Sequence, residues 1–129
     1  MKRYLLDTHT LLWSVSDPQK LSSKGRFILE REKCVKLLSI VSIWEISLKR
    51  SLGKLNLPVS TEEFIATSQQ DLGLEIVSLE LPHIYTVEGL PFHHSDPFDR
   101  LLVAQAQCEK LQIISRDDSF DAYNVSRVW

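Results

Sequence analysis

Apolar residues along this chain occur in short runs that are separated by longer stretches with helical spacing. Strands that alternate with helices favour a parallel sheet, because each return to the sheet needs a crossover connection. The pattern therefore predicts an α/β fold. The expected strands are Lys2 to Leu6, Lys36 to Ile40, Glu75 to Leu79, Leu111 to Ser115 and an edge strand from Asn124 to Val128.

The stretches between these runs carry the signals of helix boundaries. A serine before an apolar run can accept a hydrogen bond from a free N–H group, and a glycine at the end tolerates the left-handed backbone that stops a helix. Helices are expected from Leu11, from Ser22 or Ser23 to about Glu32, from Ser42 to near Gly53, from Ser60 to about Leu72 and from Leu81 to Gly89.

A further helix begins at a proline that two aspartates flank. With Pro97 as the first helical residue, Asp96 becomes the N-cap and Asp99 the third residue of the helix. Asp99 then shares its face with Leu102 and Val103, so its carboxylate points in the same direction as the core side chains. We interpret Asp99 as a candidate catalytic residue.

A purely structural explanation exists for both aspartates. Each can satisfy free N–H groups and the helix dipole, which is worth about 1 kcal/mol for a cap. Capping fully explains Asp96, whereas an acid at the head of an apolar face favours a function for Asp99. Arg100 shares its own face with Ala104 and Gln107, so we expect this stripe to be more solvated.

Acids also follow the first and the fourth predicted strands. Asp7 follows one and Asp117 the other, and in open α/β sheets the carboxyl ends of strands line the ligand crevice. The alternative for Asp7 is an N-cap, and the neighbouring Asp118 leaves open which acid faces the site. Glu45 lies beside an apolar helix face, or it forms an exposed i, i+4 pair with Lys49.

Four carboxylates gathered at one edge of a sheet cannot all stay ionised without cations. Mg²⁺ and Mn²⁺ prefer oxygen ligands and would relieve the repulsion among Asp7, Glu45, Asp99 and Asp117. Bound metal can activate water and stabilise the leaving oxygen of a phosphodiester. The cluster therefore predicts metal-dependent phosphodiester hydrolysis.

Length and composition narrow the class of protein. With 129 residues, 43% of them hydrophobic, the chain suits one domain spanning residues 1–129. No uncharged run is longer than the nine residues from Thr8 to Ser16, well below the roughly 20 that a membrane helix needs. The N-terminus lacks a signal-peptide core, and the two cysteines lack metal-type spacing. We expect a cytoplasmic protein without membrane contact.

Four motifs in this order and spacing resemble the PIN-domain nucleases, especially the VapC-type toxins of bacterial toxin–antitoxin pairs. Each motif is weak alone, but together they are highly specific and cover nearly the whole chain. They are Leu5-Leu6-Asp7-Thr8-His9-Thr10-Leu11-Leu12-Trp13, Val41-Ser42-Ile43-Trp44-Glu45-Ile46, His94-Ser95-Asp96-Pro97-Phe98-Asp99-Arg100 and Ile114-Ser115-Arg116-Asp117.

The resemblance implies a three-layer sandwich, with a twisted, mainly parallel sheet of four to five strands between helices. It also implies a Mg²⁺ or Mn²⁺ site, cleavage of single-stranded RNA, a small antitoxin partner and a homodimer. Thr8 would support the site through its hydroxyl, with Asp96 and Ser115 as further supporting residues. Many family members have threonine where this chain has Ser115. The metal-binding and catalytic residues carried over are Asp7, Glu45, Asp99 and Asp117.

The uneven distribution of charge suggests where RNA would approach. Residues 1–60 contain eleven Lys and Arg against five Asp and Glu, so this half can attract a polyanion. We predict that Lys49, Arg50 and Lys54 line the path of the RNA backbone, although a solvated helix face gives the same pattern. Apolar faces around Trp13 and Trp44 would accept an antitoxin segment or a second copy of the chain.

Other functions fit less well. A haloacid-dehalogenase-like phosphatase needs a second aspartate two residues after the first, where this chain has His9. A receiver-type signalling module needs an aspartate after the third strand and a lysine after the fifth, and neither is present. The remaining alternatives are a housekeeping PIN-domain nuclease without antitoxin and a non-catalytic PIN-fold interaction module. The presence of all four acids argues against the second.

Overall fold

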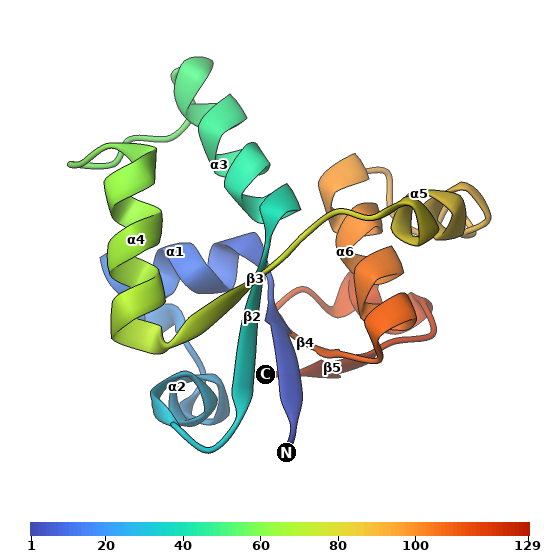
Figure 1. The fold of residues 1–129 in the computed structure, drawn as a ribbon, viewed down its shortest axis with the longest axis horizontal. Coiled ribbons are helices and arrows are strands. Elements are labelled where there is room, and N and C mark those ends of the chain that lie inside the picture. The colour runs from blue at the N-terminus through green and yellow to red at the C-terminus, as the bar shows by residue number, and fades with distance from the viewer.

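A five-stranded, fully parallel sheet forms the centre of the molecule (Figure 1). The computed structural model describes residues 1–129. The strands lie in the order β3-β2-β1-β4-β5, so β1 is central and β5 forms an edge, as predicted. Their bounds are β1 Arg3–Leu6, β2 Val35–Ser39, β3 Leu74–Val77, β4 Gln112–Ile114 and β5 Ser126–Val128.

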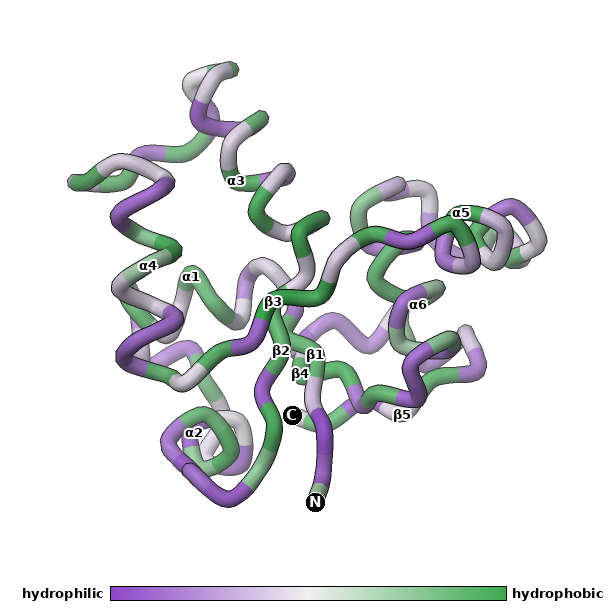
Figure 2. The backbone as a smooth tube through the Cα atoms, viewed as in Figure 1, coloured by the Kyte–Doolittle hydropathy of each residue, from purple (hydrophilic) through white to green (hydrophobic).

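Helices cover both faces of this sheet. Figure 1 shows α1, α2 and α4 on one side and α5 and α6 on the other, which confirms the α/β sandwich. In Figure 2 the helices alternate between hydrophobic and hydrophilic residues along their turns, as expected for helices with one buried face. The bounds are α1 Thr8–Ser16, α2 Ser23–Glu30, α3 Ile40–Ser51, α4 Thr61–Leu72, α5 Leu81–Glu88 and α6 Pro97–Glu109, with 3₁₀ turns η1 Pro18–Lys20 and η2 Asp118–Ala122.

The alternation of side chains along each strand divides the core in two. In β1, Leu6 packs with residues of α1, α2 and α4, whereas its neighbour Leu5 packs with residues of α6. Ile114 and Ile113 of β4 divide in the same way. Successive side chains on a strand point to opposite faces, so runs of consecutive apolar residues indicate a sheet that is buried on both sides.

Several predicted boundaries shift for local reasons. Helix α1 begins at Thr8 rather than Leu11, because Asp7 takes the N-cap position and its carbonyl oxygen accepts from the N–H of Leu11. Helix α3 begins at Ile40 instead of Ser42, since the Ser39 hydroxyl caps it by accepting from the N–H of Val41. Strand β3 ends at Val77, two residues before the predicted end, because its partner strand β2 ends there.

The expectation that Arg100 is solvated is wrong. Its side chain is buried, and the guanidinium donates hydrogen bonds to the carbonyl oxygens of Val87, Leu90 and Pro91 and to the hydroxyl of Tyr123. Helical periodicity identifies the face on which a residue lies, but here the segment after α5 folds over that face. Arg100 therefore holds this segment against α6.

The strand order places a crevice beside β1. The chain builds the sheet outward from β1 through β2 to β3 and then returns to the other side of β1 with β4. At such a reversal, the two flanking loops diverge at the carboxyl ends of the strands and leave room for a ligand. Asp7 follows β1 at this point and Ser115 follows β4. None of the helices has both the length and the apolar character that crossing a membrane requires.

Candidate active site

Asp7 and Asp117 are linked across the two central strands by one serine. Asp7 is 5% exposed, and its Oδ2 accepts a hydrogen bond of 2.8 Å from the Ser115 hydroxyl. The same Ser115 oxygen accepts from the N–H of Asp117 at 3.0 Å. Burial raises the pKa of Asp7, and the charges of Glu45 and Asp117 add to this, while the Ser115 hydrogen bond opposes it.

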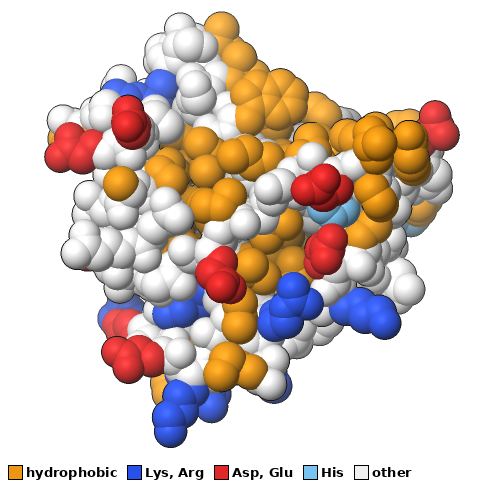
Figure 3. Space-filling model, in the orientation of Figure 1, with side chains coloured by type: hydrophobic (Ala, Val, Ile, Leu, Met, Phe, Trp, Pro, Cys, Tyr) orange, Lys and Arg blue, Asp and Glu red, His pale blue; other side chains and the backbone are white.

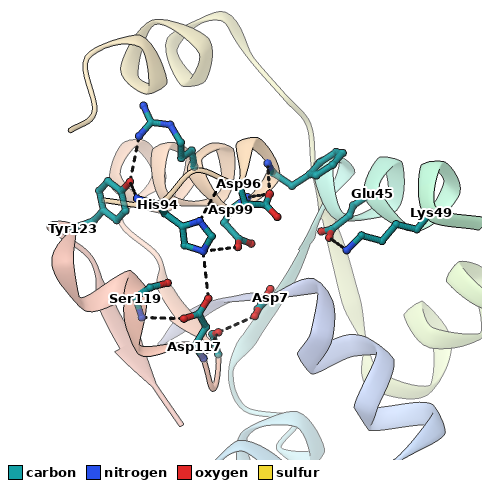
Figure 4. A network of polar contacts seen from close by, with 12 residues as sticks. Asp7, Glu45, Lys49, His94, Asp96, Asp99, Asp117, Ser119 and Tyr123 are labelled. Atoms are coloured by element: carbon teal, nitrogen blue, oxygen red, sulfur yellow. Dashed lines mark hydrogen bonds and ion pairs between the residues drawn. The ribbon is translucent and has the colours of Figure 1, made fainter. Parts of the chain in front are cut away.

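The two aspartates of α6 have different surroundings. Asp96 is the N-cap, as predicted, and its Oδ1 accepts from the N–H groups of Phe98 at 2.8 Å and Asp99 at 3.2 Å. The Asp99 side chain is 16% exposed and points into the space shared with the other acids (Figure 4). Burial, followed by the charges of Asp7, Asp96 and other nearby carboxylates, raises the pKa of Asp99 to about 8.

Glu45 combines the two interpretations that its sequence position allowed. It is buried on α3, and its Oε2 accepts a hydrogen bond from Lys49 one turn later. This hydrogen bond is the main reason that the pKa of Lys49 is raised. The other carboxylate oxygen, Oε1, is buried without any hydrogen-bond partner. A buried polar atom in this state costs about 1–3 kcal/mol, and a cation would relieve that cost.

His94 belongs to the cluster, although the sequence analysis assigned it no role. Its Nε2 lies 3.1 Å from Asp99 Oδ2 and 3.5 Å from Asp117 Oδ2. Its Nδ1 accepts from the N–H of Asp96 at 3.0 Å, so the ring proton lies on Nε2. The sequence signal was a histidine two residues before a helix N-cap, but periodicity does not decide whether His93 or His94 turns inward.

The two adjacent aspartates differ in their contacts, because Asp117 lies beside His94 and Asp118 does not. Asp117 caps η2, its Oδ1 accepts from Ser119, and its Oδ2 faces His94. Burial would raise the pKa of Asp117, but the hydrogen bonds from Ser119 and His94 outweigh it and lower the pKa. Asp118 is exposed and lies outside the cluster.

The remaining candidate residues divide between the site and its surroundings. The Thr8 hydroxyl donates to Ser42 at 2.9 Å and so links α1 to α3 without contacting an acid. Arg50 donates to the Val59 carbonyl oxygen and the Thr61 hydroxyl, which commits it to the connection between α3 and α4. Lys49 lies beside the acids, and Lys54 is exposed at the end of α3.

The residues present fit a hard divalent cation. Carboxylate oxygens are the ligands that Mg²⁺ and Mn²⁺ prefer, and the cluster includes a buried oxygen of Glu45 that lacks any partner. His94, Asp99 and Asp117 bring one potential ligand atom each to within 4.8 Å of one another. His94 presents a protonated nitrogen to Asp99 and Asp117, so in this arrangement it contacts the two carboxylates and is not free to bind a metal ion. Asp7, Glu45, Asp99 and Asp117 are the residues whose oxygens could hold the cation.

Comparisons with known proteins agree with this architecture. The family profile described as PIN domain matches residues 4–125. No curated protein sequence matches the chain.

Three solved structures match at nearly full length. VapBC2 from Rickettsia felis bound to a promoter DNA fragment has a TM-score of 0.72 and 13% identity, covering 98% of this chain and 97% of that chain. A toxin–antitoxin complex from Klebsiella pneumoniae gives 0.65 and 16%, with 98% and 96% covered. FitAcB from Neisseria gonorrhoeae gives 0.63 and 18%, also with 98% and 96% covered. At these identities the three structures establish a shared fold.

Proposed function

The chain belongs to the PIN-domain family, and from this membership and its acidic site we propose a divalent-metal-dependent endoribonuclease that cleaves single-stranded RNA. The observation that carries the proposal is the convergence of four carboxylates from distant parts of the chain, one with a buried oxygen that has no partner. A metal-free cluster of this kind is costly to fold. Binding of a cation would offset this cost.

The four acids share one role in the proposed site, and two further residues orient them. Asp7, Glu45, Asp99 and Asp117 hold Mg²⁺ or Mn²⁺, which when bound would polarise the phosphodiester and activate water. Ser115 orients the Asp7 carboxylate by donating to it. Asp96 fixes the first turn of α6 and thereby the direction of Asp99.

Lys49 supplies positive charge beside the acids, and His94 supplies a ring N–H. Lys49 is 37% exposed while its ammonium contacts Glu45, so it can reach a phosphate at the rim of the site. His94 directs its N–H at Asp99 and Asp117 and acts as a positioning residue for both. Together they would offset part of the repulsion between the RNA backbone and the carboxylates.

A cleavage assay with matched variants tests the proposal. Labelled single-stranded RNA is incubated with Mg²⁺ or Mn²⁺ and with the wild-type chain or Asp7→Asn, Glu45→Gln or Asp99→Asn. Each of these variants should lose cleavage, whereas Asp118→Asn should keep it because Asp118 lies outside the cluster. Full metal-dependent cleavage by Asp99→Asn would contradict the assignment, and a chain that binds RNA without cleaving it would support an interaction module instead.

A small antitoxin is the second part of the proposal. The Klebsiella pneumoniae relative was solved as a toxin–antitoxin complex. In this chain a groove of about 680 Å³ between α1 and α4 has apolar side chains, among them Val15, Leu57, Phe64 and Leu72, beside polar ones. We assign this groove to an apolar segment of the antitoxin. If co-expression of the neighbouring open reading frames yields no complex, the chain is instead a housekeeping nuclease.

We also propose that two copies of the chain pair through α3. Ile40, Trp44, Leu48 and Leu52 recur every four residues and remain exposed, forming one apolar stripe. Figure 3 shows apolar side chains along the rim over α3 and α5, and a continuous patch of this kind indicates an interface. Light scattering should give a dimer for the wild type and a monomer for Leu48→Glu. A wild-type monomer at micromolar concentration would contradict this pairing.

A further inference from the structure

We propose that the groove between α1 and α3 binds one nucleotide of the single-stranded RNA next to the cleaved bond, with Trp13 stacking on its base. The groove has a volume of about 420 Å³ and is distinct from the groove between α1 and α4. This inference rests on the ribonuclease proposed above. The residues that line this groove would determine the affinity for that nucleotide.

The groove lies next to the acidic site. Two of its lining residues adjoin site acids, because Thr8 follows Asp7 in the chain and the Lys49 ammonium contacts the buried Glu45. Trp13, Lys20 and Lys54 also line the groove. A strand whose phosphate lies at the acids would therefore place the adjoining nucleotide in this groove.

Trp13 is a fixed aromatic surface with cations around it. Its ring packs edge-on against Trp129 at 6.1 Å between centroids and is tilted against His9 at 5.7 Å. Lys20 Nζ lies 5.6 Å and Arg116 Cζ 5.9 Å from the ring centroid. An aromatic ring for the base combined with cations for the backbone is the arrangement by which proteins bind single strands.

The charges in the groove are available to a phosphate. Lys54 makes no ion pair, and Lys20 pairs with Asp17 at 3.3 Å while half of its side chain remains exposed. An exposed pair of this kind contributes little to stability, so Lys20 can exchange Asp17 for a phosphate oxygen. With Lys49 paired to Glu45, Lys20 and Lys54 face one aspartate along the groove lining, which favours an anionic occupant.

The lining favours RNA over a protein segment. Its lining includes the indole of Trp13 and three lysines. The groove between α1 and α4 has aliphatic side chains and a phenyl ring suited to an apolar peptide, whereas this groove offers an aromatic face and ammonium groups.

The test measures RNA binding without cleavage. Binding of a labelled hexauridylate is followed by fluorescence anisotropy in an Asp99→Asn background with Mn²⁺ present. Trp13→Ala should raise Kd about tenfold, as expected for losing one stacked base, and Trp13→Tyr should restore most of the affinity. Phe27→Ala is the matched control, because Phe27 is an exposed ring on α2 that does not line the groove. It should leave Kd unchanged.

Two further measurements identify the nucleotide and the phosphate contacts. In hexamers with one abasic position at a time, a single position should abolish the difference between Trp13 and Trp13→Ala. Lys54→Ala should reduce the slope of log Kd against log salt concentration by about 0.7, while Lys24→Ala on α2 should not. Melting temperatures of all variants verify that each is folded.

The outcomes distinguish a failure of the proposed nucleotide subsite from a failure of the proposed ribonuclease activity. If the wild type cleaves RNA but Trp13→Ala binds as tightly as the wild type, or no abasic position is coupled to Trp13, the subsite is wrong and the ribonuclease stands. If the wild type cleaves no RNA with any divalent metal, the ribonuclease itself fails. A groove that binds a deca-glutamate peptide through Trp13 and does not bind hexauridylate would overturn the subsite in favour of a protein partner.

Discussion

Two neighbouring residues of α6 bury charge in opposite ways. Arg100 is 7% exposed, and its guanidinium has three carbonyl oxygens and one hydroxyl as acceptors. Asp99 faces the other acids, and its pKa is raised to about 8 because burial and like charges disfavour its ionised form. The hydrogen bonds of Arg100 compensate for burying its charge, so Arg100 stabilises the fold. The carboxylate of Asp99 is surrounded by like charges, so its ionised form requires a cation that the chain itself does not supply.

The largest expected effect comes from removing the satisfied charge. Arg100→Ala leaves the carbonyl oxygens of Leu90 and Pro91, in the segment after α5, without their guanidinium donor, so we expect a loss of about 3 kcal/mol in the free energy of unfolding. Asp99→Asn removes a charge that is repelled by its neighbours and should leave the metal-free chain as stable or more stable. Urea denaturation of both variants in EDTA measures the two changes in stability. Equal destabilisation by Arg100→Ala and Asp99→Asn would contradict the distinction between the two buried charges.

The second effect is a dependence of stability on pH. Asp99 ionises near its ordinary pKa of 3.8 when unfolded and near 8 when folded, so the folded chain binds more protons between these values. Stability of the metal-free chain should therefore fall as pH rises from about 4 to about 8, by an amount on the order of a few kcal/mol. Asp99→Asn should flatten the curve.

Mn²⁺ should oppose this trend, because the metal binds the ionised carboxylate and its affinity rises with pH. Thermal melts between pH 5 and 9, with Mn²⁺ and with EDTA, measure both effects. A wild-type curve in EDTA that does not fall over this range would contradict the raised pKa.

A smaller effect distinguishes a hydrogen-bond donor from a metal ligand. His94 Nε2 lies 3.1 Å from Asp99 and 3.5 Å from Asp117, while its other nitrogen accepts from the backbone N–H of Asp96. Loss of an orienting residue of this kind weakens metal binding about tenfold to 100-fold. His94→Gln should therefore lower Mn²⁺ affinity by roughly tenfold in calorimetry, with His93→Gln as the unaffected control. A complete loss of binding would identify His94 as a ligand.

The smallest effect concerns the cap. Asp96→Ala removes the acceptor for two N–H groups at the start of α6 and should cost about 1 kcal/mol of stability. The melting temperature should fall by a few degrees yet still rise when Mn²⁺ is added. If Asp96→Ala melts like the wild type and no longer responds to Mn²⁺, Asp96 is itself a ligand and the distinction between the two aspartates of α6 is wrong.

Much of the architecture follows from patterns local to the chain. Consecutive apolar residues in β1 and β4 indicated strands buried on both faces, and Pro97 with Asp96 determined how α6 begins. These features depend on residues within a few positions of one another, so periodicity and capping chemistry suffice to predict them. The helix starts at Thr8 and Ile40 were missed by two or three residues, because the turn chemistry there also permits a later start.

The sequence by itself determined the α/β alternation, the cap at Asp96 and which acids follow strands. Only the tertiary structure decided that His94 turns into the cluster, that Asp117 rather than Asp118 does so, and that Arg100 is covered. Each of these depends on contacts between segments distant in the chain, such as the segment after α5 folding over α6. Backbone periodicity assigns a side chain to a face, but what covers that face depends on how the remaining chain packs against it.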